Sequence, residues 1–109
     1  MVDSKTVELS SPRRAAQDET SLTLLSAVAD PVRWTVLAIL TEHGTTCVCS
    51  LQERVPVAPN LLSYHLKVLR EAGLVTTTRR GRWVDYTLAD GAGDRLCDAL
   101  PVPTDRHQP

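Results

Sequence analysis

The sequence has no uninterrupted apolar stretch that is long enough to cross a bilayer, since a transmembrane helix needs about 20 such residues. It also has no basic start followed by an apolar run and a small-residue cleavage site, the pattern of a secretory signal. We therefore expect a cytoplasmic protein with no membrane partner. Cysteine is scarce, at three residues, so we expect reduced thiols and no disulfide framework.

Patterns typical of enzymes are also missing. The sequence shows no paired carboxylates that a cleft would bring together, no glycine-rich loop that would cradle phosphates, and no nucleophile set beside a base. We do not expect an enzyme.

Length and composition indicate one folded domain. A chain of 109 residues can bury a single core, and its apolar share of 42% and charged share of 23% are ordinary for a globular protein. Its ends are polar or rich in proline. We expect a flexible N-terminal arm over residues 1–17, a domain over 18–100, and a flexible C-terminal tail over 101–109.

Apolar residues recur at helical spacing in several segments, and each segment has recognisable ends. Asp30-Pro31 is a helix start, because Asp caps exposed amides and Pro suits the first turn. Pro59 is placed in the same way, and Gly44 and Gly73 are placed as terminators. Trp34 falls on a helix and is expected to pack in the core. The helices are expected over 18–29, 31–42, 47–55, 60–72 and 90–100.

A change of period follows the fourth helix. Residues 75–78 are rich in β-branched side chains, and Val84, Tyr86 and Leu88 alternate, with Arg80-Gly81 as the turn between two strands. The fold class is therefore mainly α with a small β-hairpin. The order α-α-α-α-β-β-α is that of a winged helix-turn-helix.

The net charge of -1 counts against a nucleic-acid partner, because affinity for DNA comes largely from neutralising phosphates. The distribution matters more than the sum. Residues 60–88 hold five basic and two acidic side chains, an excess of three positive charges. A two-sided chain of this kind can orient itself on a polyanion.

The helix over 60–72 buries Leu62, Leu66 and Leu69, and its other side is polar and basic. Such a face fits the major groove, while a hairpin with arginines can lie along phosphates or enter the neighbouring minor groove. The alternative is a solvated face; for His65, an orienting role is at least as plausible as base contact. The candidate DNA-binding residues are Asn60, Ser63, Tyr64, His65, Lys67, Arg70, Arg79, Arg80 and Arg82.

Four strings together resemble the ArsR/SmtB family of metal-responsive repressors over about residues 22–88. They are Ala29-Asp30-Pro31-Val32-Arg33, Cys47-Val48-Cys49-Ser50-Leu51, LSYHLKVLREAGLV over 62–75, and GRWVDYTL over 81–88. The resemblance implies a homodimer held mainly by its first and last helices, which binds double-stranded DNA at an inverted repeat. It also implies release of that DNA when a metal or metalloid binds.

Cys47 and Cys49 form a candidate thiol site. On a regular helix they would lie about 200° apart, which favours the alternative of small buried apolar residues, although at a frayed first turn they can share an ion. The resemblance implies a thiolate sensor there, with As(III), Cd, Zn or Ni as effector, none of them needed for folding. Cys97 is the candidate third ligand. Asp90, Asp94 and Asp98 form a row on the last helix that is either an oxygen-rich ion site or a solvated edge.

Two other functions remain open at this point. The chain can be a winged-helix regulator without its own metal sensor, controlled by a partner protein or by thiol oxidation. It can also be a protein-interaction module that has lost DNA binding, as the negative net charge would allow.

Overall fold

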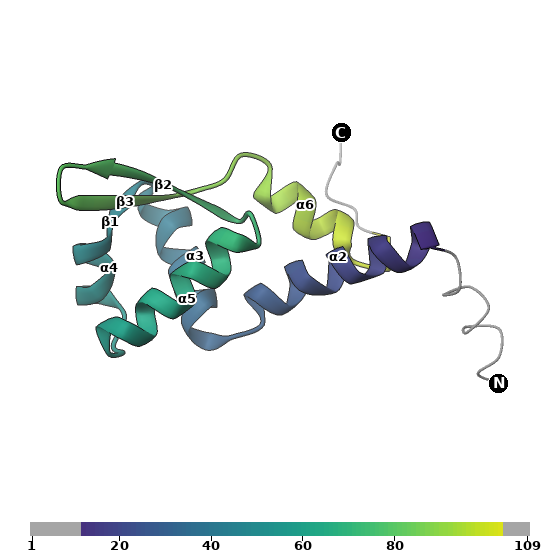
Figure 1. The fold of residues 1–109 in the computed structure, drawn as a ribbon, viewed down its shortest axis with the longest axis horizontal. Helices are drawn as coiled ribbons and strands as arrows, with labels where there is room; N and C mark the ends of the chain where they lie inside the picture. The colour runs from purple at the N-terminus through teal and green to yellow at the C-terminus, as the bar shows by residue number, and fades with distance from the viewer. Residues whose placement is uncertain (1–11, 104–109) are drawn as a thin grey trace.

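The computed structural model describes residues 12–103, and side chains from Asp18 onward. The elements in chain order are α2 (Pro12–Val28), α3 (Pro31–His43), β1 (Thr46–Cys47), α4 (Val48–Arg54), α5 (Pro59–Glu71), β2 (Val75–Arg80), β3 (Trp83–Leu88) and α6 (Ala92–Ala99). The strands form one antiparallel sheet in the order β1-β3-β2. Figure 1 shows α2 and α6 together at one end, with α4, α5 and the sheet at the other.

This arrangement confirms the expected fold class, a mainly α chain with a hairpin wing after a helix-turn-helix. It differs in one element. β1 was not predicted, so the order within the described residues is α-α-β-α-α-β-β-α and the sheet has three strands rather than two.

The short strand β1 replaces the start of the third predicted helix. Thr46 pairs with Tyr86, and Cys47 pairs with Asp85. The backbone of Cys47 is extended, with φ -68° and ψ 145°, and pairing with β3 satisfies backbone groups that a helix would have satisfied internally. The helix predicted over 47–55 therefore begins at Val48.

Two other boundaries differ from the prediction. α2 begins at Pro12, so residues 12–17 of the expected arm are helical. Pro is well tolerated in the first turn of a helix, but the polar composition of this segment shows no apolar period that would have predicted the helix. The two residues between the paired strands are Gly81 and Arg82, one position later than expected. Gly81 has φ +60°, as the first central residue of a type II′ turn requires.

The core forms around the apolar stripe of α5, as the sequence predicts. Leu62, Leu66 and Leu69 are buried, and they join Val36 and Leu40 of α3 in one cluster. The prediction for Trp34 is wrong, because 66% of this residue is exposed.

The end of α5 fixes where the hairpin starts. The amide of Leu74 donates to the carbonyl of Leu69 at 3.0 Å, and that of Gly73 donates to Arg70 at 3.0 Å. Gly73 has φ +77°, so these two hydrogen bonds make a Schellman cap. Strand β2 thus leaves directly from the end of the helix whose polar face is the candidate reading surface.

No single helix among the described residues is both long and apolar enough to cross a membrane. Residues 18–28 of α2 and the whole of α3 reach that length and composition only as a pair, which is bent by 83° at the break.

Asp30 caps α3, as predicted. Its carboxylate accepts the amides of Val32 at 2.8 Å and Arg33 at 3.1 Å. Both hydrogen bonds lower the pKa of Asp30, and the bond from the amide of Arg33 has the larger effect. A lowered folded pKa contributes stability that is complete above the unfolded value, about 3.9, and is lost as pH falls through the folded value.

We therefore expect Asp30→Asn, which keeps an oxygen acceptor but no charge, to lower the thermal midpoint at about pH 7. The gap to the unmodified protein should close only as pH falls from about 4 through the lowered pKa of Asp30 in the folded protein. Thermal unfolding monitored by circular dichroism measures both. Asp30→Ala, which removes the cap itself, is the control and should lie lower still. A gap between the Asn variant and the parent that persists unchanged to about pH 2 would show that the carboxylate charge is not responsible.

Candidate nucleic-acid interface and thiol pair

The helix-turn-helix consists of α4, a connection over 55–58, and α5. Ala58 precedes α5 and makes no side-chain cap, while Pro59 occupies the first turn. The buried leucines turn the opposite face of α5 toward solvent. Five of the six candidate DNA-binding residues on this helix are exposed, namely Asn60, Ser63, Tyr64, Lys67 and Arg70.

Among the residues that the structure describes, Lys67 has one ionic neighbour. Its Nζ lies 4.0 Å from Oε2 of Glu71, one helical turn further on, and more than half of each side chain is exposed. Exposed pairs of this kind contribute little free energy. The ammonium group can therefore leave Glu71 for a stronger anion such as a phosphate.

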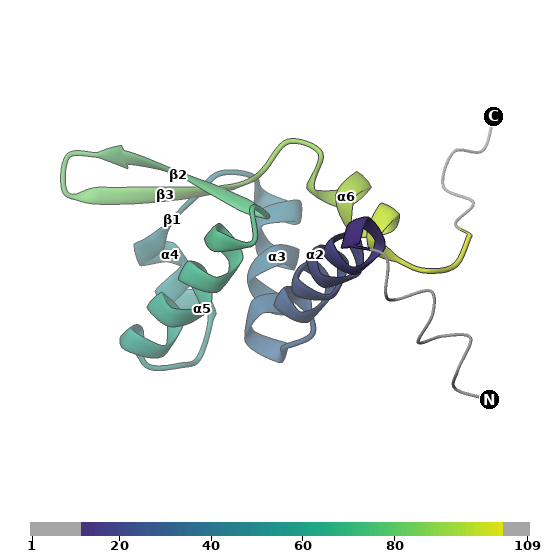
Figure 2. The ribbon, with the colours of Figure 1, turned by 45° about the vertical axis from the view of Figure 1, so that its right-hand side comes forward.

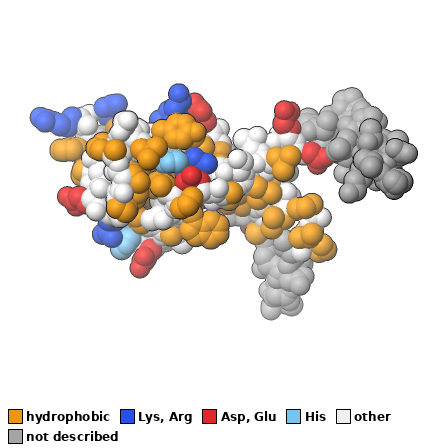
Figure 3. Space-filling view, turned by 90° about the horizontal axis from the view of Figure 1, so that it is seen from below, with side chains coloured by type: hydrophobic (Ala, Val, Ile, Leu, Met, Phe, Trp, Pro, Cys, Tyr) orange, Lys and Arg blue, Asp and Glu red, His pale blue; other side chains and the backbone are white. Residues whose placement is uncertain are grey.

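The β2–β3 hairpin projects away from the core. In β2 only Val75 is buried, and in β3 only Tyr86. All three arginines predicted for this region, Arg79, Arg80 and Arg82, are exposed. Figure 3 shows basic side chains at the end of the molecule where Figure 1 places the hairpin tip.

Arg80 is held by an ion pair across the hairpin. Its Nε and one terminal nitrogen donate to the two oxygens of Asp85 at 2.5 and 2.9 Å. This bidentate contact raises the pKa of Arg80 and lowers the pKa of Asp85. The two-pronged contact fixes the orientation of the planar guanidinium and balances its charge with that of the carboxylate. Arg80 is therefore less accessible to a phosphate than its exposure suggests.

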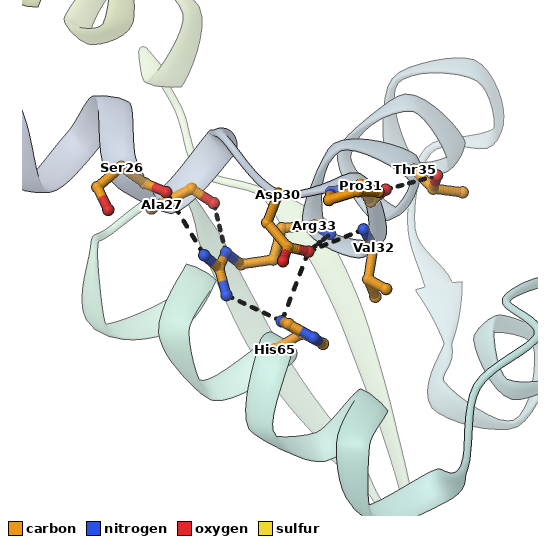
Figure 4. Close-up of polar contacts among 8 residues, drawn as sticks. All are labelled: Ser26, Ala27, Asp30, Pro31, Val32, Arg33, Thr35 and His65. Carbon is orange, nitrogen blue, oxygen red and sulfur yellow. Dashed lines mark hydrogen bonds and ion pairs between the residues drawn. The ribbon is translucent and has the colours of Figure 1, made fainter.

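His65 differs from the other candidates on α5. Only 7% of it is exposed, and its Nδ1 lies 2.9 Å from a terminal nitrogen of Arg33 and 3.8 Å from Oδ1 of Asp30 (Figure 4). The structure thus places His65 in a polar cluster between α3 and α5. The sequence suggests a structural role for Arg33 with carboxyl groups of the next helix as its partners. The structure gives it the His65 ring and two backbone carbonyls of α2 instead.

Cys47 and Cys49 meet at the start of α4. Their Sγ atoms are 2.7 Å apart, and the amide of Cys49 donates to Sγ of Cys47 at 3.4 Å. Because Cys47 lies on β1 and caps α4, the angular separation expected on a regular helix does not apply. Hydrogen bonds from the side chain of Cys49, and then from its amide, lower the pKa of Cys47. The same side-chain contact raises the pKa of Cys49. The two thiols therefore differ, and Cys47 loses its proton more readily than Cys49.

Cys97 is not brought to this pair. It lies on α6, and Figures 1 and 2 place α6 and α4 in different parts of the molecule. Across residues 12–103, no three His, Cys, Asp or Glu side chains gather into a group that could hold a metal ion. Within one chain, the structure therefore offers two thiols at this pair. Asp90 lies before α6, so the three aspartates predicted as a row on the last helix do not share that helix, and among the described residues they form no such group.

Cys97 instead lines an apolar groove of about 630 Å³. The groove runs between α2, α3 and α6, and exposed Trp34 forms part of its wall. The other lining residues are Leu25, Val28, Leu37, Ala38, Thr41, Glu42, Leu96 and Leu100.

Comparison with known proteins agrees with this geometry. The family described as "Bacterial regulatory protein, arsR family" matches residues 30–77. The chain is 41% identical over 80 residues to the arsenical resistance operon repressor of Bacillus subtilis (strain 168), an alignment that covers 67% of this chain and 76% of that protein. It is 46% identical over 67 residues to the HTH-type transcriptional repressor SmtB of Mycobacterium tuberculosis (strain CDC 1551 / Oshkosh), covering 62% of this chain and 49% of that one.

A solved structure extends the likeness to the fold. The crystal structure of NolR from Sinorhizobium fredii superposes with a TM-score of 0.70 at 31% identity, over 79% of this chain and 86% of that one. The family match includes the capped start of α3, the thiol pair and all of α5. The chain therefore belongs to the arsR family of bacterial regulatory proteins, which are transcriptional regulators and not enzymes.

Proposed function

We propose that the protein binds an inverted repeat in double-stranded DNA as a homodimer and that a thiophilic ion at Cys47 and Cys49 modulates this binding. The observation that carries the proposal is the exposed polar face of α5 directly beside an exposed, arginine-bearing hairpin. In this arrangement α5 enters the major groove, and the hairpin follows the phosphates or reaches the neighbouring minor groove.

The proposed contacts differ in kind. Asn60, Ser63 and Tyr64 lie in the first half of α5 and carry side chains that hydrogen-bond to base edges or phosphates. The cationic contacts to the backbone come from Lys67, Arg70, Arg79 and Arg82, with a smaller contribution from Arg80 because of its ion pair.

We expect Lys67→Ala to reduce the slope of log K against log salt by about one unit for each bound protomer. The reason is that DNA binding releases fewer counterions when one phosphate contact is lost. Fluorescence anisotropy with a promoter fragment, titrated with salt, measures this slope. Arg82→Ala should act alike, and Arg80→Ala should act less. The matched control is Asp90→Asn, which changes the charge by the same amount at an exposed residue between β3 and α6 and should leave the slope unchanged. An unaltered slope in Lys67→Ala would remove Lys67 from the phosphate contacts.

The proposed dimer surface is the groove between α2, α3 and α6. A wall that includes Leu25, Leu96 and a tryptophan with 66% of its surface exposed is more apolar than a monomer usually leaves uncovered. A second copy of the chain would cover it with the same surface, as twofold symmetry requires. Such a dimer presents two α5 helices to half-sites about 34 Å apart, which matches an inverted repeat.

If the groove is the dimer surface, Trp34→Glu and Leu100→Glu should each shift the protein toward monomer, because each places a charge in an apolar contact. Sedimentation equilibrium over a range of concentrations measures the shift. The matched control is Trp83→Glu, since Trp83 is also exposed, at 46%, but lies on the hairpin. A dimer that resists both substitutions would place the interface elsewhere.

The proposed effector site is the thiol pair. Thiolates favour soft or borderline ions, and a thiol held partly as thiolate is the reactive form. As(III), Cd and Zn fit these donors better than Ni, and two of the relatives described above have arsenical resistance or SmtB in their names. Because Cys97 is remote within one chain, we propose no role for it at this site.

The contact between the two sulfur atoms also favours a second candidate, in which thiol oxidation controls DNA binding. A mass measurement on the reduced protein with arsenite separates the two candidates. We expect one arsenite bound per chain, lost in Cys47→Ser and Cys49→Ser and retained in Cys97→Ser, the matched control. If no ion binds and mild peroxide removes two hydrogen atoms from the chain instead, the oxidation candidate holds.

A further inference from the structure

Arg33 of α3 contacts two other helices at once, the end of α2 and the middle of α5. Its Nε donates to the carbonyl of Ala27 at 2.7 Å, and one terminal nitrogen reaches the carbonyl of Ser26 at 3.5 Å. The other terminal nitrogen lies 2.9 Å from Nδ1 of His65. Figure 4 shows the guanidinium between the last turn of α2 and the middle of α5. One side chain from α3 therefore joins the groove-lining helix to the candidate reading helix.

This contact defines the state of the His65 ring. A guanidinium only donates, so Nδ1 of His65 must be the accepting nitrogen and Nε2 must carry the proton. Oδ1 of Asp30, 3.8 Å from the same nitrogen, also caps α3 and so belongs to the same cluster. Arg33 thus selects one tautomer of the histidine, while the carboxylate, which can only accept, lies beyond hydrogen-bond distance of Nδ1.

The cluster is costly to break. With 7% of His65 exposed, an unpaired Nδ1 would lose water and gain no protein partner. No buried side-chain nitrogen or oxygen among the described residues lacks a hydrogen-bond partner. Arg33 also donates hydrogen bonds to two carbonyls in the last turn of α2, where backbone carbonyls have no partner within the helix.

His65 is well placed to orient the reading face. It lies between Ser63 and Lys67 on α5, and its ring meets that of Tyr64 edge-on, with centroids 5.1 Å apart. Tyr64 itself is 56% exposed. Fixing His65 therefore fixes the rotation of α5 and supports the exposed ring beside it.

We infer that Arg33 and His65 are positioning residues that hold α5 at a set orientation relative to α2, and that His65 acts on DNA binding through Arg33 rather than by touching DNA. This inference rests on the DNA binding proposed above and assigns two of its residues a separate role. It also gives a path from the groove, which α2 lines through Leu25 and Val28, to the reading helix.

Two amide substitutions distinguish the two nitrogens of His65. In His65→Asn the side-chain oxygen can take the place of Nδ1 and accept from Arg33. In His65→Gln the longer side chain places its amide near the position of Nε2. We expect the Asn variant to bind operator DNA within about threefold of the parent and the Gln variant to bind about tenfold more weakly, both with an unchanged salt slope.

The opposite pattern would overturn the inference. If His65→Gln retains binding while His65→Asn loses it, or if the salt slope falls by about one unit per protomer, His65 contacts DNA through Nε2. Arg33→Lys supplies the partner test, because an ammonium cannot span the carbonyls and the ring together. It should weaken binding as His65→Gln does, and the double variant should be no weaker than either one.

A measurement on the unmodified protein keeps the test independent of whether variants fold. Nitrogen-15 NMR of the His65 ring should show Nδ1 unprotonated and Nε2 protonated at neutral pH, and a proton on Nδ1 would sink the inference. Failure of the unmodified protein to bind any duplex at low salt would refute the proposed function instead. The ring tautomer and the non-additive stability of the Arg33 and His65 variants would still report on the junction.

Discussion

Burial of one face of α5 is the constraint on which the rest of the structure depends. Leu62, Leu66 and Leu69 pack against α3, so the opposite side of α5 faces outward with Asn60, Ser63, Tyr64, Lys67 and Arg70, while His65 stays on the buried side. The Schellman cap at Gly73 then ends the helix and sends β2 out from the same place. Packing of three leucines and one left-handed glycine therefore sets the reading helix and the hairpin side by side, before any contact with DNA exists.

Two arginines tie this reading unit to the half of the molecule formed by α2 and α6. Arg33 joins the end of α2 to the middle of α5, and Arg95 of α6 donates to the carbonyl of Gly73 at 2.6 Å, at the end of α5. Both bind backbone carbonyls at helix ends, which require partners. A helix held at two points has little freedom to rotate. A change in how α2 and α6 pack would therefore have to move or break these two contacts.

Local patterns predicted the parts of the fold that local physics determines. The leucine period gave α5, and Asp30-Pro31 gave the start of α3, because these signals act within a few residues. The strand β1 could not be found in this way, since two residues become a strand only when Tyr86 and Asp85 of a distant segment pair with them. Trp34 was misassigned for a similar reason: helical spacing marks an apolar face but does not say whether the same chain covers it.

The candidate site shows the same division, and charge makes it clearest. The sequence predicted the basic hairpin. It did not predict that Asp85 forms an ion pair with Arg80, because this cross-strand contact depends on the register of the two strands. That register also sets Cys47 opposite Asp85. The carboxylate of Asp85 opposes the lowering of the pKa of Cys47, and both cysteines add to the raising of the pKa of Arg80. Cys47, the carboxylate and the guanidinium thus lie on one sheet, with Cys49 beside them at the start of α4. The register of two short strands therefore decides which charged groups neighbour the thiol pair, and no spacing within one segment could have predicted it.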